Sequence, residues 1–341
     1  MKLTLIGAGR MGIRHIQGAI QLPEIQEITI IDIKQESLDN AKNILTTAEA
    51  NPNNKQFNFM LWEDFAKKPS QTDIIIDAST AQNRLRNAEI LLKTNCKHLL
   101  VEKPLGQSQK SVQDLITFFA DKNVEVVVNL NMRLYESFNK IRTDLQNMPQ
   151  LKGFANISVN TGTIGIGANG IHYLDLCLFV LDANRVELVA GEIDETLIPS
   201  GRGANFGDFG GWATIKFYNN ETYKGRLQIS ISSQSTAFGG WEIIAPNGKI
   251  QFNEIDGKVH YQVRKEDSTM PVSRYFADYQ PTETYSFEAP FLGDLTKKWL
   301  ENLIQKNIQT LPYLKDALVV HNLMFDWLNL SKTHKEIFPI T

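Results

Sequence analysis

The chain has 341 residues, more than one hydrophobic core usually organises, so two domains are expected. Its hydrophobic fraction of 42% and charged fraction of 21% are typical of a soluble globular protein. A net charge of −3 without any basic run gives no electrostatic reason to expect nucleic acid as a partner.

The sequence also argues against a secreted or membrane protein. Cys96 and Cys177 are the only cysteines, too few for a disulfide framework. No stretch approaches the roughly 18 uninterrupted apolar residues of a membrane helix. A glycine-rich segment starts at residue 7 and leaves no room for a signal peptide before it. We therefore expect a cytoplasmic protein with no membrane partner.

The first 32 residues predict a strand, a glycine-rich turn, a helix and a second strand that ends in an acid. An apolar run at 3–6 precedes Gly7-Ala8-Gly9-Arg10-Met11-Gly12, helical spacing covers 10–21, and the run at 28–31 ends at Asp32. In such a motif Gly7 permits the tight turn, Gly9 lets the backbone approach a pyrophosphate, and Gly12 allows close packing of helix on strand. The backbone N–H groups at the helix start, around Arg10 and Met11, would hold the phosphates. An ordinary strand–helix turn with a chance acid is the alternative.

Asp32 indicates which nicotinamide cofactor is bound. Its carboxylate would accept hydrogen bonds from the ribose 2′-hydroxyl and repel a 2′-phosphate. The expected cofactor is therefore NAD, and NADP is less favoured.

The rest of the first 125 residues continues this alternation. Strands are predicted at 73–77, 98–101 and 124–128, and helices at 35–50, 82–94 and 108–122, the last capped by Ser108. A weaker strand and short helix follow at 55–60 and 62–68. Such alternation predicts right-handed βαβ units in an α/β Rossmann domain with a doubly wound parallel sheet, residues 1–123.

The second half, residues 124–341, predicts an α+β domain with a large, mainly antiparallel open sheet. Strands are expected at 154–160, 186–193, 212–218, 222–232, 241–244, 249–252 and 258–264, and helices at 170–181, 290–306 and 312–331. We interpret the glycine-rich segment 162–170 as flexible. Gly201–Gly211 misses the dinucleotide spacing, and we interpret it as a mobile loop near the active site.

The strand at 98–101 ends in Glu102-Lys103-Pro104. Ligands of open parallel sheets lie outside the carboxyl ends of the strands, so this tripeptide should point into the cofactor crevice. Lys103 could then donate to the nicotinamide carboxamide and to a substrate hydroxyl. A solvated charged loop is the alternative reading of the tripeptide alone.

Several motifs in chain order resemble those of the Gfo/Idh/MocA oxidoreductase family. They are the glycine-rich turn, Asp32, Ile74–Asp77 leading to Ala78-Ser79-Thr80, Lys97–Pro104, Asn131-Met132-Arg133, Gly170–Asp175, and a C-terminal helix at Leu311–Ala317. The resemblance covers nearly the whole chain, and Glu-Lys-Pro is its most specific element. It implies a Rossmann domain followed by an open-sheet domain that often forms the oligomer interface, and oxidation or reduction at a sugar or cyclitol hydroxyl.

The resemblance also implies roles for particular residues. Lys103 and His172 would be catalytic, with supporting or substrate-binding roles for Asp175, Asn169 and Arg133. The residues expected to bind the cofactor are Gly7, Gly9, Arg10, Met11, Gly12, Asp32, Ser79, Thr80, Glu102 and Lys103.

The surroundings of His172 agree with a role as a base. It lies in the first turn of an amphipathic helix, whose positive end disfavours the imidazolium. A neutral ring is what removal of a hydroxyl proton requires. Asp175 follows at i+3 on the same face and could orient the ring. A buried structural histidine bonded to the backbone is the alternative.

One residue departs from the family pattern. The family commonly has an aspartate four residues before the histidine, and here that position is Ala168. Either the substrate differs from the usual polyol, or another residue fills the role, or catalysis is impaired. A branch of the family with Asn-x-Ile-His here is associated with surface-polysaccharide sugars, which points to nucleotide sugars or acidic amino sugars.

The sequence thus predicts an NAD-dependent oxidoreductase acting on a secondary alcohol of a sugar-like substrate. The alternatives are a catalytically silent nicotinamide-binding sensor or scaffold, and an NAD-dependent redox glycosidase. No metal is expected, since the remaining histidines lack ligand spacing. A homodimer or homotetramer is expected through the sheet face bearing Ile215, Phe217, Leu227, Ile229 and Ile231.

Overall fold

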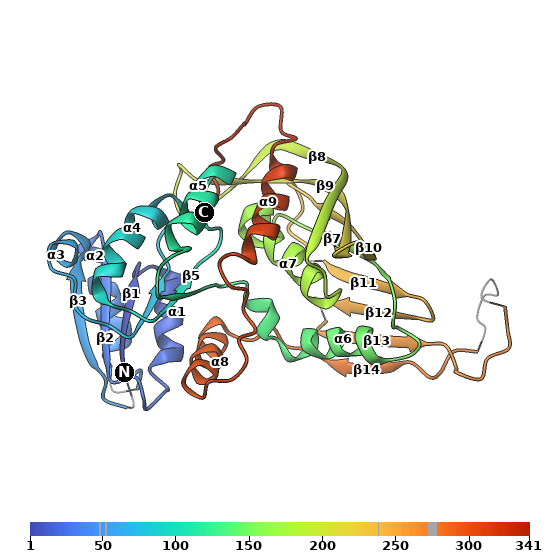
Figure 1. Ribbon diagram of the computed structural model, residues 1–341, viewed down its shortest axis with the longest axis horizontal. Helices are drawn as coiled ribbons and strands as arrows, with labels where there is room; N and C mark the ends of the chain where they lie inside the picture. Colours follow the sequence, from blue (N-terminus) through green and yellow to red (C-terminus); the bar gives the residue numbers. More distant parts are fainter. Residues whose placement is uncertain (48, 52, 238, 255, 272–277) are drawn as a thin grey trace. The chain divides into compact units, whose positions relative to one another are not determined.

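The computed structural model describes all residues except 48, 52, 238, 255 and 272–277. The described chain forms two compact units. The first unit contains residues 1–134, 290–318 and 341, and the second contains 135–289 and 319–340 (Figure 1). Two stretches from the C-terminal part therefore belong to the first unit.

Within the described residues, the first unit is built on a six-stranded sheet in the order β3-β2-β1-β4-β5-β6. The strands are β1 (Lys2–Ile6), β2 (Glu27–Asp32), β3 (Gln56–Leu61), β4 (Ile74–Asp77), β5 (His98–Val101) and β6 (Glu125–Val128). All neighbouring strands are parallel. From β1 the chain adds β2 and β3 on one side of the sheet, and it then adds β4, β5 and β6 on the other side of β1. This is the doubly wound dinucleotide-binding order, which confirms the predicted fold class.

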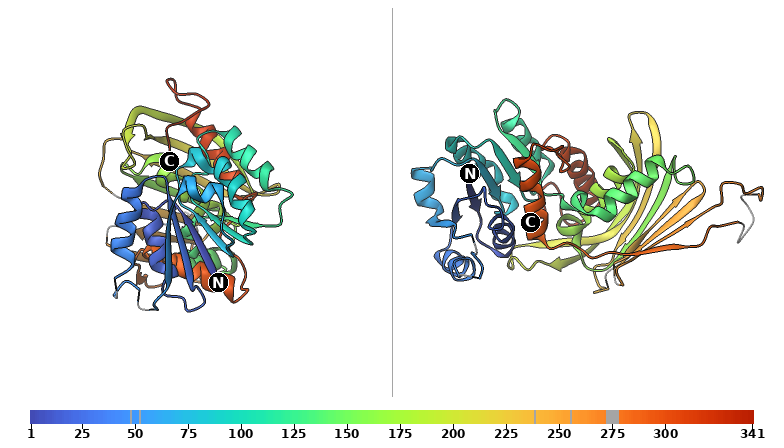
Figure 2. Two further views of the ribbon diagram at one scale, coloured as in Figure 1. Left: turned by 90° about the vertical axis from the view of Figure 1, so that its left-hand side faces the viewer. Right: turned by 90° about the horizontal axis from the view of Figure 1, so that it is seen from below.

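Helices flank this sheet (Figure 2). They are α1 (Arg10–Ala19), α2 (Gln35–Leu45), α3 (Trp62–Lys67), α4 (Arg84–Leu91), α5 (Gln109–Phe119) and α8 (Leu292–Ile304). The predicted cap of α5 is confirmed, because the Ser108 hydroxyl accepts a hydrogen bond from the backbone N–H of Ser111 at 3.1 Å. α8 crosses α1 so closely that a Cβ on Gly18 would overlap the carbonyl oxygen of Gly293. Only glycine permits this crossing.

The helix predicted at 312–331 is wrong in its first turn. Residues 312–314 run beside β6, where the Val128 N–H donates to the Pro312 carbonyl and the Leu314 N–H to the Val126 carbonyl, each at 3.0 Å. The helix itself, α9, covers Ala317–Leu328. The helical spacing of apolar residues does not show that residues 312–314 form backbone hydrogen bonds with the edge strand β6 in place of a helical turn.

The described part of the second unit has an eight-stranded sheet in the order β14-β13-β12-β11-β7-β10-β9-β8. The strands are β7 (Ala155–Thr161), β8 (Arg185–Pro199), β9 (Gly207–Asn219), β10 (Thr222–Ile231), β11 (Gly240–Ala245), β12 (Gly248–Asn253), β13 (Lys258–Val263) and β14 (Glu283–Ser286). β10 and β7 are parallel, and the other pairs are antiparallel. The predicted large, mainly antiparallel sheet is confirmed.

Helices α6 (Glu136–Asn147), α7 (Ile171–Val180) and α9 lie on one face of this sheet (Figure 2). The prediction that an oligomer forms through Ile215, Phe217, Leu227, Ile229 and Ile231 is wrong about the face, because these residues are at most 2% exposed within the single chain. Helix α6, which was not predicted from the sequence, supplies part of the cover on this sheet.

The interpretation of Gly201–Gly211 as a mobile loop is wrong for its second half, which is the start of β9. The glycines serve strand packing there. A Cβ on Gly210 would lie 2.5 Å from the Ile231 carbonyl oxygen, and one on Gly211 would overlap that of Glu192. β9 lies between β8 and β10, so close backbone approach explains these glycines.

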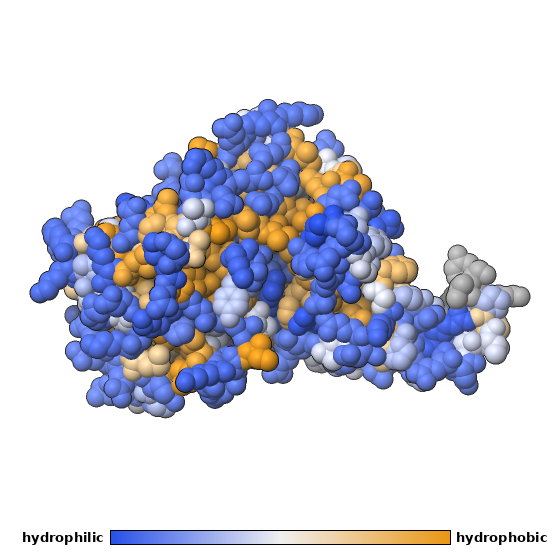
Figure 3. All heavy atoms as spheres, in the orientation of Figure 1, coloured by the Kyte–Doolittle hydropathy of each residue, from blue (hydrophilic) through white to orange (hydrophobic). Residues whose placement is uncertain are grey.

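No helix in the described part of the chain is long and apolar enough to cross a membrane. On the face drawn in Figure 3, hydrophilic side chains cover most of the surface around α2 and α3 and around β13 and β14.

Candidate active site

The glycine-rich turn between β1 and α1 has the backbone geometry that its sequence predicts. Gly7 has φ +96°, and a Cβ on it would lie 2.9 Å from the backbone carbonyl of Ala78. A Cβ on Gly12 would overlap the carbonyl oxygen of Gly7. Among the described residues, nothing lies within 4 Å of a Cβ placed on Gly9. Side chains are thus excluded at Gly7 and Gly12 by the protein itself, whereas the space at Gly9 is open for a ligand.

Asp32 lies at the carboxyl end of β2 and is tied to this turn. Its Oδ2 accepts a hydrogen bond from the Ala8 N–H at 2.7 Å, and its Oδ1 accepts one from the Lys34 N–H at 2.9 Å. Each carboxylate oxygen can accept a second hydrogen bond, so the half-buried group can also bind a hydroxyl.

These residues fit a nicotinamide dinucleotide. Within the described chain no side chain caps the first turn of α1, which starts at Arg10 and Met11, so its N–H groups can bind phosphate oxygens. The open space at Gly9 lies at the same helix end, and a Cβ there would fill it.

The segment after β4, which contains Ser79 and Thr80, is held by a buried ion pair. Arg84 lies 2.8 Å from Asp77, and both side chains are at most 3% exposed. The Arg84 guanidinium also donates to the Asp77 carbonyl at 2.7 Å, and the Ser79 N–H donates to the Asp77 carboxylate at 3.0 Å. Asn87 donates to the Ser79 hydroxyl at 2.9 Å. The backbone at the carboxyl end of β4 is therefore fixed by its own helix α4.

Glu102, after β5, is buried at 2% exposure and points into a polar cluster. Its Oε1 accepts from His15 Nε2 at 3.0 Å and from Asn129 Nδ2 at 2.7 Å. Its Oε2 accepts from the Lys103 backbone N–H at 3.2 Å. Because a carboxylate oxygen can only accept, Nε2 of His15 carries the hydrogen in this contact. The side chain of Glu102 thus fixes the backbone from which Lys103 projects.

The same cluster determines the charge of Glu102. Burial alone raises the pKa of its carboxyl, but the hydrogen bond and charge of His15, the charge of Lys103 and the Asn129 hydrogen bond outweigh this and hold the pKa well below its usual range. The other ring nitrogen of His15 lies 2.7 Å from the hydroxyl of Thr296 in α8. Glu102 is therefore an ionised group inside the first unit.

Lys103 is half-buried and is joined to Pro104 by a cis peptide bond. Arg133 is half-buried in the short 3₁₀ turn Asn131–Leu134 that follows β6. The neighbouring strand ends β5 and β6 carry both residues, on the side of the sheet where parallel strands bind their ligands.

In the second unit, His172 and Asp175 both lie in α7 and are 7% and 1% exposed. Residues 165–170 form a π-helical turn that leads directly into α7. Asn169 lies in this turn, exposed, and its side-chain amide donates to the Ile164 carbonyl at 3.2 Å. His172 is therefore in the first turn of α7, but the helical segment as a whole begins earlier than the sequence predicted.

The predicted site residues thus fall in two groups. Gly7, Gly9, Arg10, Met11, Gly12, Asp32, Ser79, Thr80, Glu102, Lys103 and Arg133 lie in the first unit, and Asn169, His172 and Asp175 lie in the second. The residues that support them, namely His15, Arg84, Asn129 and Thr296, were not predicted from the sequence. One signal was present for His15, which lies one helical turn after Gly12 and so shares the buried face of α1.

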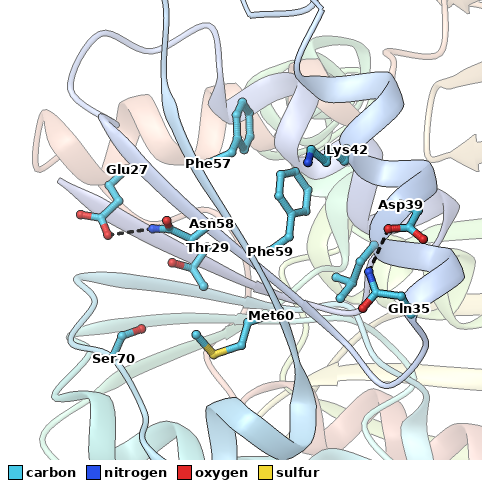
Figure 4. Close-up of a pocket in the computed structure, with 11 residues that line it drawn as sticks. Glu27, Thr29, Gln35, Asp39, Lys42, Phe57, Asn58, Phe59, Met60 and Ser70 are labelled. Carbon is cyan, nitrogen blue, oxygen red and sulfur yellow. Dashed lines mark hydrogen bonds between the residues drawn. The ribbon is translucent and has the colours of Figure 1, made fainter.

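An open groove lies elsewhere in the first unit, along the edge strand β3 and α2 (Figure 4). Its polar lining is largely paired within itself, with Asn58 donating to Glu27 at 3.1 Å and Gln35 to Asp39 at 2.8 Å. We assign no ligand to this groove.

Residues 1–130 match the Gfo/Idh/MocA family model, described as an oxidoreductase family with an NAD-binding Rossmann fold. The match ends just after β6 and contains all the residues that were predicted to bind the cofactor. No curated protein sequence matches the chain.

Solved structures share the fold over nearly the full length. An oxidoreductase from Agrobacterium radiobacter, in complex with NAD+, L-tartaric acid and magnesium, has a TM-score of 0.69 at 13% identity, covering 99% of this chain and 98% of that chain. GenD2 from gentamicin A biosynthesis, in complex with NAD, has a TM-score of 0.69 at 13% identity and coverage of 98% and 95%. The UDP-N-acetylglucosamine 3-dehydrogenase of Acidithiobacillus ferrooxidans has a TM-score of 0.66 at 14% identity and coverage of 97% of both chains.

Proposed function

We propose that the chain, whose residues 1–130 match the NAD-binding Rossmann domain of the Gfo/Idh/MocA family of oxidoreductases, interconverts a secondary alcohol and a ketone on a sugar or sugar derivative. The observation that carries this proposal is the pairing of a dinucleotide turn with a lysine at the carboxyl end of β5. The turn offers open backbone at Gly9, and Lys103 is anchored through its own backbone N–H by Glu102.

In the proposed reaction, bound NAD supplies hydride transfer to or from the substrate carbon. Lys103 donates hydrogen bonds to the substrate oxygen and stabilises its developing negative charge. The His172 imidazole takes the hydroxyl proton in oxidation and returns it in reduction. Asp175, one helical turn further along α7, orients the His172 ring. Arg133 and Asn169 are proposed to contact the substrate.

Two considerations support a nucleotide sugar or an acidic amino sugar as the substrate class. One structurally similar protein is a UDP-N-acetylglucosamine 3-dehydrogenase, and another comes from gentamicin A biosynthesis. Asn169-Gly170-Ile171-His172 also has the Asn-x-Ile-His pattern that the family resemblance links to surface-polysaccharide sugars.

The test combines ligand identification with turnover. Mass spectrometry of small molecules that copurify with the protein would name the cofactor and, where retained, the substrate. NADH formation is then followed with a panel of UDP-sugars, hexoses and cyclitols. Net NADH accumulation supports the dehydrogenase. Product formation from glycosides without net NADH would instead indicate the redox glycosidase, and bound NAD without turnover of any compound would indicate the silent sensor.

We predict that the protein binds NADH at least about tenfold more tightly than NADPH, a difference of about 1.4 kcal/mol, because the Asp32 carboxylate repels a 2′-phosphate. Asp32→Asn keeps an oxygen that can accept from the Ala8 N–H but removes the charge, so NADPH affinity should rise while NADH affinity changes little. Titration of protein fluorescence with both reduced cofactors measures this. Equal or tighter NADPH binding by the unmodified protein would contradict the assignment.

We also propose a homo-oligomer, now through the outer face of the eight-stranded sheet. The apolar residues first expected at the interface are buried, whereas Trp212, Tyr223 and Ile244 are 44%, 41% and 48% exposed on β9, β10 and β11. Light scattering at micromolar concentration should give the mass of a dimer or tetramer, and Trp212→Glu should lower it. Ile44→Glu, on α2 at 39% exposure, is the matched control and should leave the mass unchanged. A monomeric mass for the unmodified protein would contradict the proposal.

A further inference from the structure

The helical segment that carries His172 begins at Gly165. The π-helical turn Gly165–Gly170 leads without interruption into α7, and His172 is the second residue of α7. The first backbone N–H groups of any helix lack intrahelical partners and carry a partial positive charge. In this segment those groups belong to the π-helical turn, one helical turn before His172.

The carboxylate of Asp208 lies at this helix end. It comes from the second residue of β9, a strand about 40 residues further along the chain, and is 6% exposed. Its Oδ1 accepts a hydrogen bond from the Gly167 N–H at 3.0 Å, and its Oδ2 accepts one from the Ala168 N–H at 2.6 Å. Oδ1 also accepts from the Phe209 N–H at 2.8 Å, which fixes the carboxylate on its own strand. Asp208 thus acts as a charged helix cap supplied by a distant strand.

The shape of the turn is adapted to this contact. Gly165 has φ +72°, and a Cβ on it would overlap the Asp208 carboxylate. At the other end of the turn, a Cβ on Gly170 would lie 2.9 Å from Cδ1 of Ile231 in β10. The turn therefore packs directly on β9 and β10, and the positive φ at Gly165 favours glycine there.

We propose that Asp208 is a positioning residue for His172, holding the π-helical turn so that α7 presents the imidazole in one orientation. This inference rests on the proposed function of His172. Position 168 has alanine where the family commonly has an aspartate. In this chain the Asp208 carboxylate from β9 lies at the same position and accepts a hydrogen bond from the Ala168 N–H. The π-helix is rare, and where it occurs it is mostly a single turn, frequently at a functional site.

A spectroscopic test needs no known substrate. The chain has six histidines, and the ring resonances of the full-length labelled protein can be followed by NMR. His172→Gln identifies the His172 signal by its loss. Asp208→Asn removes the charge and turns one acceptor into a donor facing the backbone N–H groups. Asp194→Asn is the matched control, since Asp194 in β8 accepts one backbone N–H, from Ser233 at 3.2 Å, outside the turn.

We expect Asp208→Asn to shift or split the His172 resonance while the other histidine signals stay in place, and Asp194→Asn to leave the His172 signal unchanged. The amides of Gly167 and Ala168 should exchange slowly in the unmodified protein and rapidly in Asp208→Asn. An unchanged His172 signal in a folded Asp208→Asn protein would overturn the proposal, as would rapid exchange of both amides in the unmodified protein. Should Asp208→Asn fail to fold, Asp208→Ser replaces it, since it is smaller and retains an acceptor.

Turnover separates this inference from the proposed function. With UDP-N-acetylglucosamine as the probe, or with the active compound of the sugar panel, Asp208→Asn should lower kcat by about tenfold to a hundredfold and leave NADH affinity unchanged. In the His172→Gln background the same substitution should cost almost nothing further, because it acts through His172. Additive losses would show a merely structural role. Unchanged turnover of His172→Gln alone would instead contradict the proposed function of His172. The NMR experiment would then still show whether Asp208 orients the His172 ring.

Discussion

Replacing His172 with alanine is expected to lower turnover by about 10²–10⁴-fold while leaving NAD affinity nearly unchanged. The size follows from the proposed role, since a general base contributes about this much to the rate. Affinity for NAD should survive because the residues that fit the dinucleotide lie in the first unit, whereas His172 lies in the second. NADH formation with the active compound of the sugar panel and fluorescence titration of NADH measure the two effects.

The control for this variant is His321→Ala. His321 lies in α9 of the same unit and is likewise buried, at 0% exposure, so its loss creates a comparable cavity. It should lower thermal stability but leave kcat within a few-fold of the unmodified protein. Equal losses of turnover in both variants would show that His172→Ala acts through stability.

Lys103 should behave differently from His172. Lys103→Ala is expected to lower kcat and weaken substrate binding together, because the same charge binds the substrate oxygen and stabilises it during the reaction. Lys103→Arg keeps the charge and should recover part of the binding but little of the turnover, since the guanidinium places its donors differently. Near-normal turnover of Lys103→Ala would contradict its proposed role.

The parts of the fold that could be predicted from the sequence are those determined by neighbouring residues. The run Ile28–Ile31 is apolar except for Thr29 because β2 is buried on both faces, and Gly12 is required because a Cβ there would overlap the Gly7 carbonyl oxygen. Ser108 was recognisable as a cap because its partner is three residues away. For the glycine turn and the helix cap, the two interacting residues lie within five positions of each other in the chain.

The supporting groups of the site could not be predicted for the opposite reason. His15 is 87 residues from Glu102 and 281 from Thr296 along the chain, so no local pattern indicates that they meet. Asp208 was hidden in a glycine-rich stretch that looked like a loop, although those glycines permit close strand packing. Long-range polar contacts of buried side chains depend on the assembled fold, and a single sequence does not show them.

Glu102→Ala is expected to lower the free energy of unfolding by about 2–6 kcal/mol, that is, about 1–3 kcal/mol for each of the two buried donors that lose their acceptor. The loss would leave His15 and Asn129 without the acceptor they share, in a region where Glu102 is 2% and His15 0% exposed. Urea denaturation measures the effect. Glu125→Gln is the matched control, because the Glu125–His98 pair on the same sheet is longer, at 3.8 Å, and partly exposed, so its loss should cost less than about 1 kcal/mol.

The stability that Glu102 contributes should depend on pH in one direction. Its pKa is lower in the folded protein than the ordinary value of 4.5, so the folded state favours the carboxylate. The contribution is therefore fully present above about pH 4.5 and is lost progressively as the pH falls from there through the lower folded pKa. Unfolding curves at pH 7 and at pH 3 to 4, in steps, should show a steeper loss for the unmodified protein than for Glu102→Gln, which has no proton to bind at this position. Parallel pH profiles of the two proteins would mean that folding does not shift the pKa of Glu102, which would contradict the stabilisation of its carboxylate by the surrounding cluster.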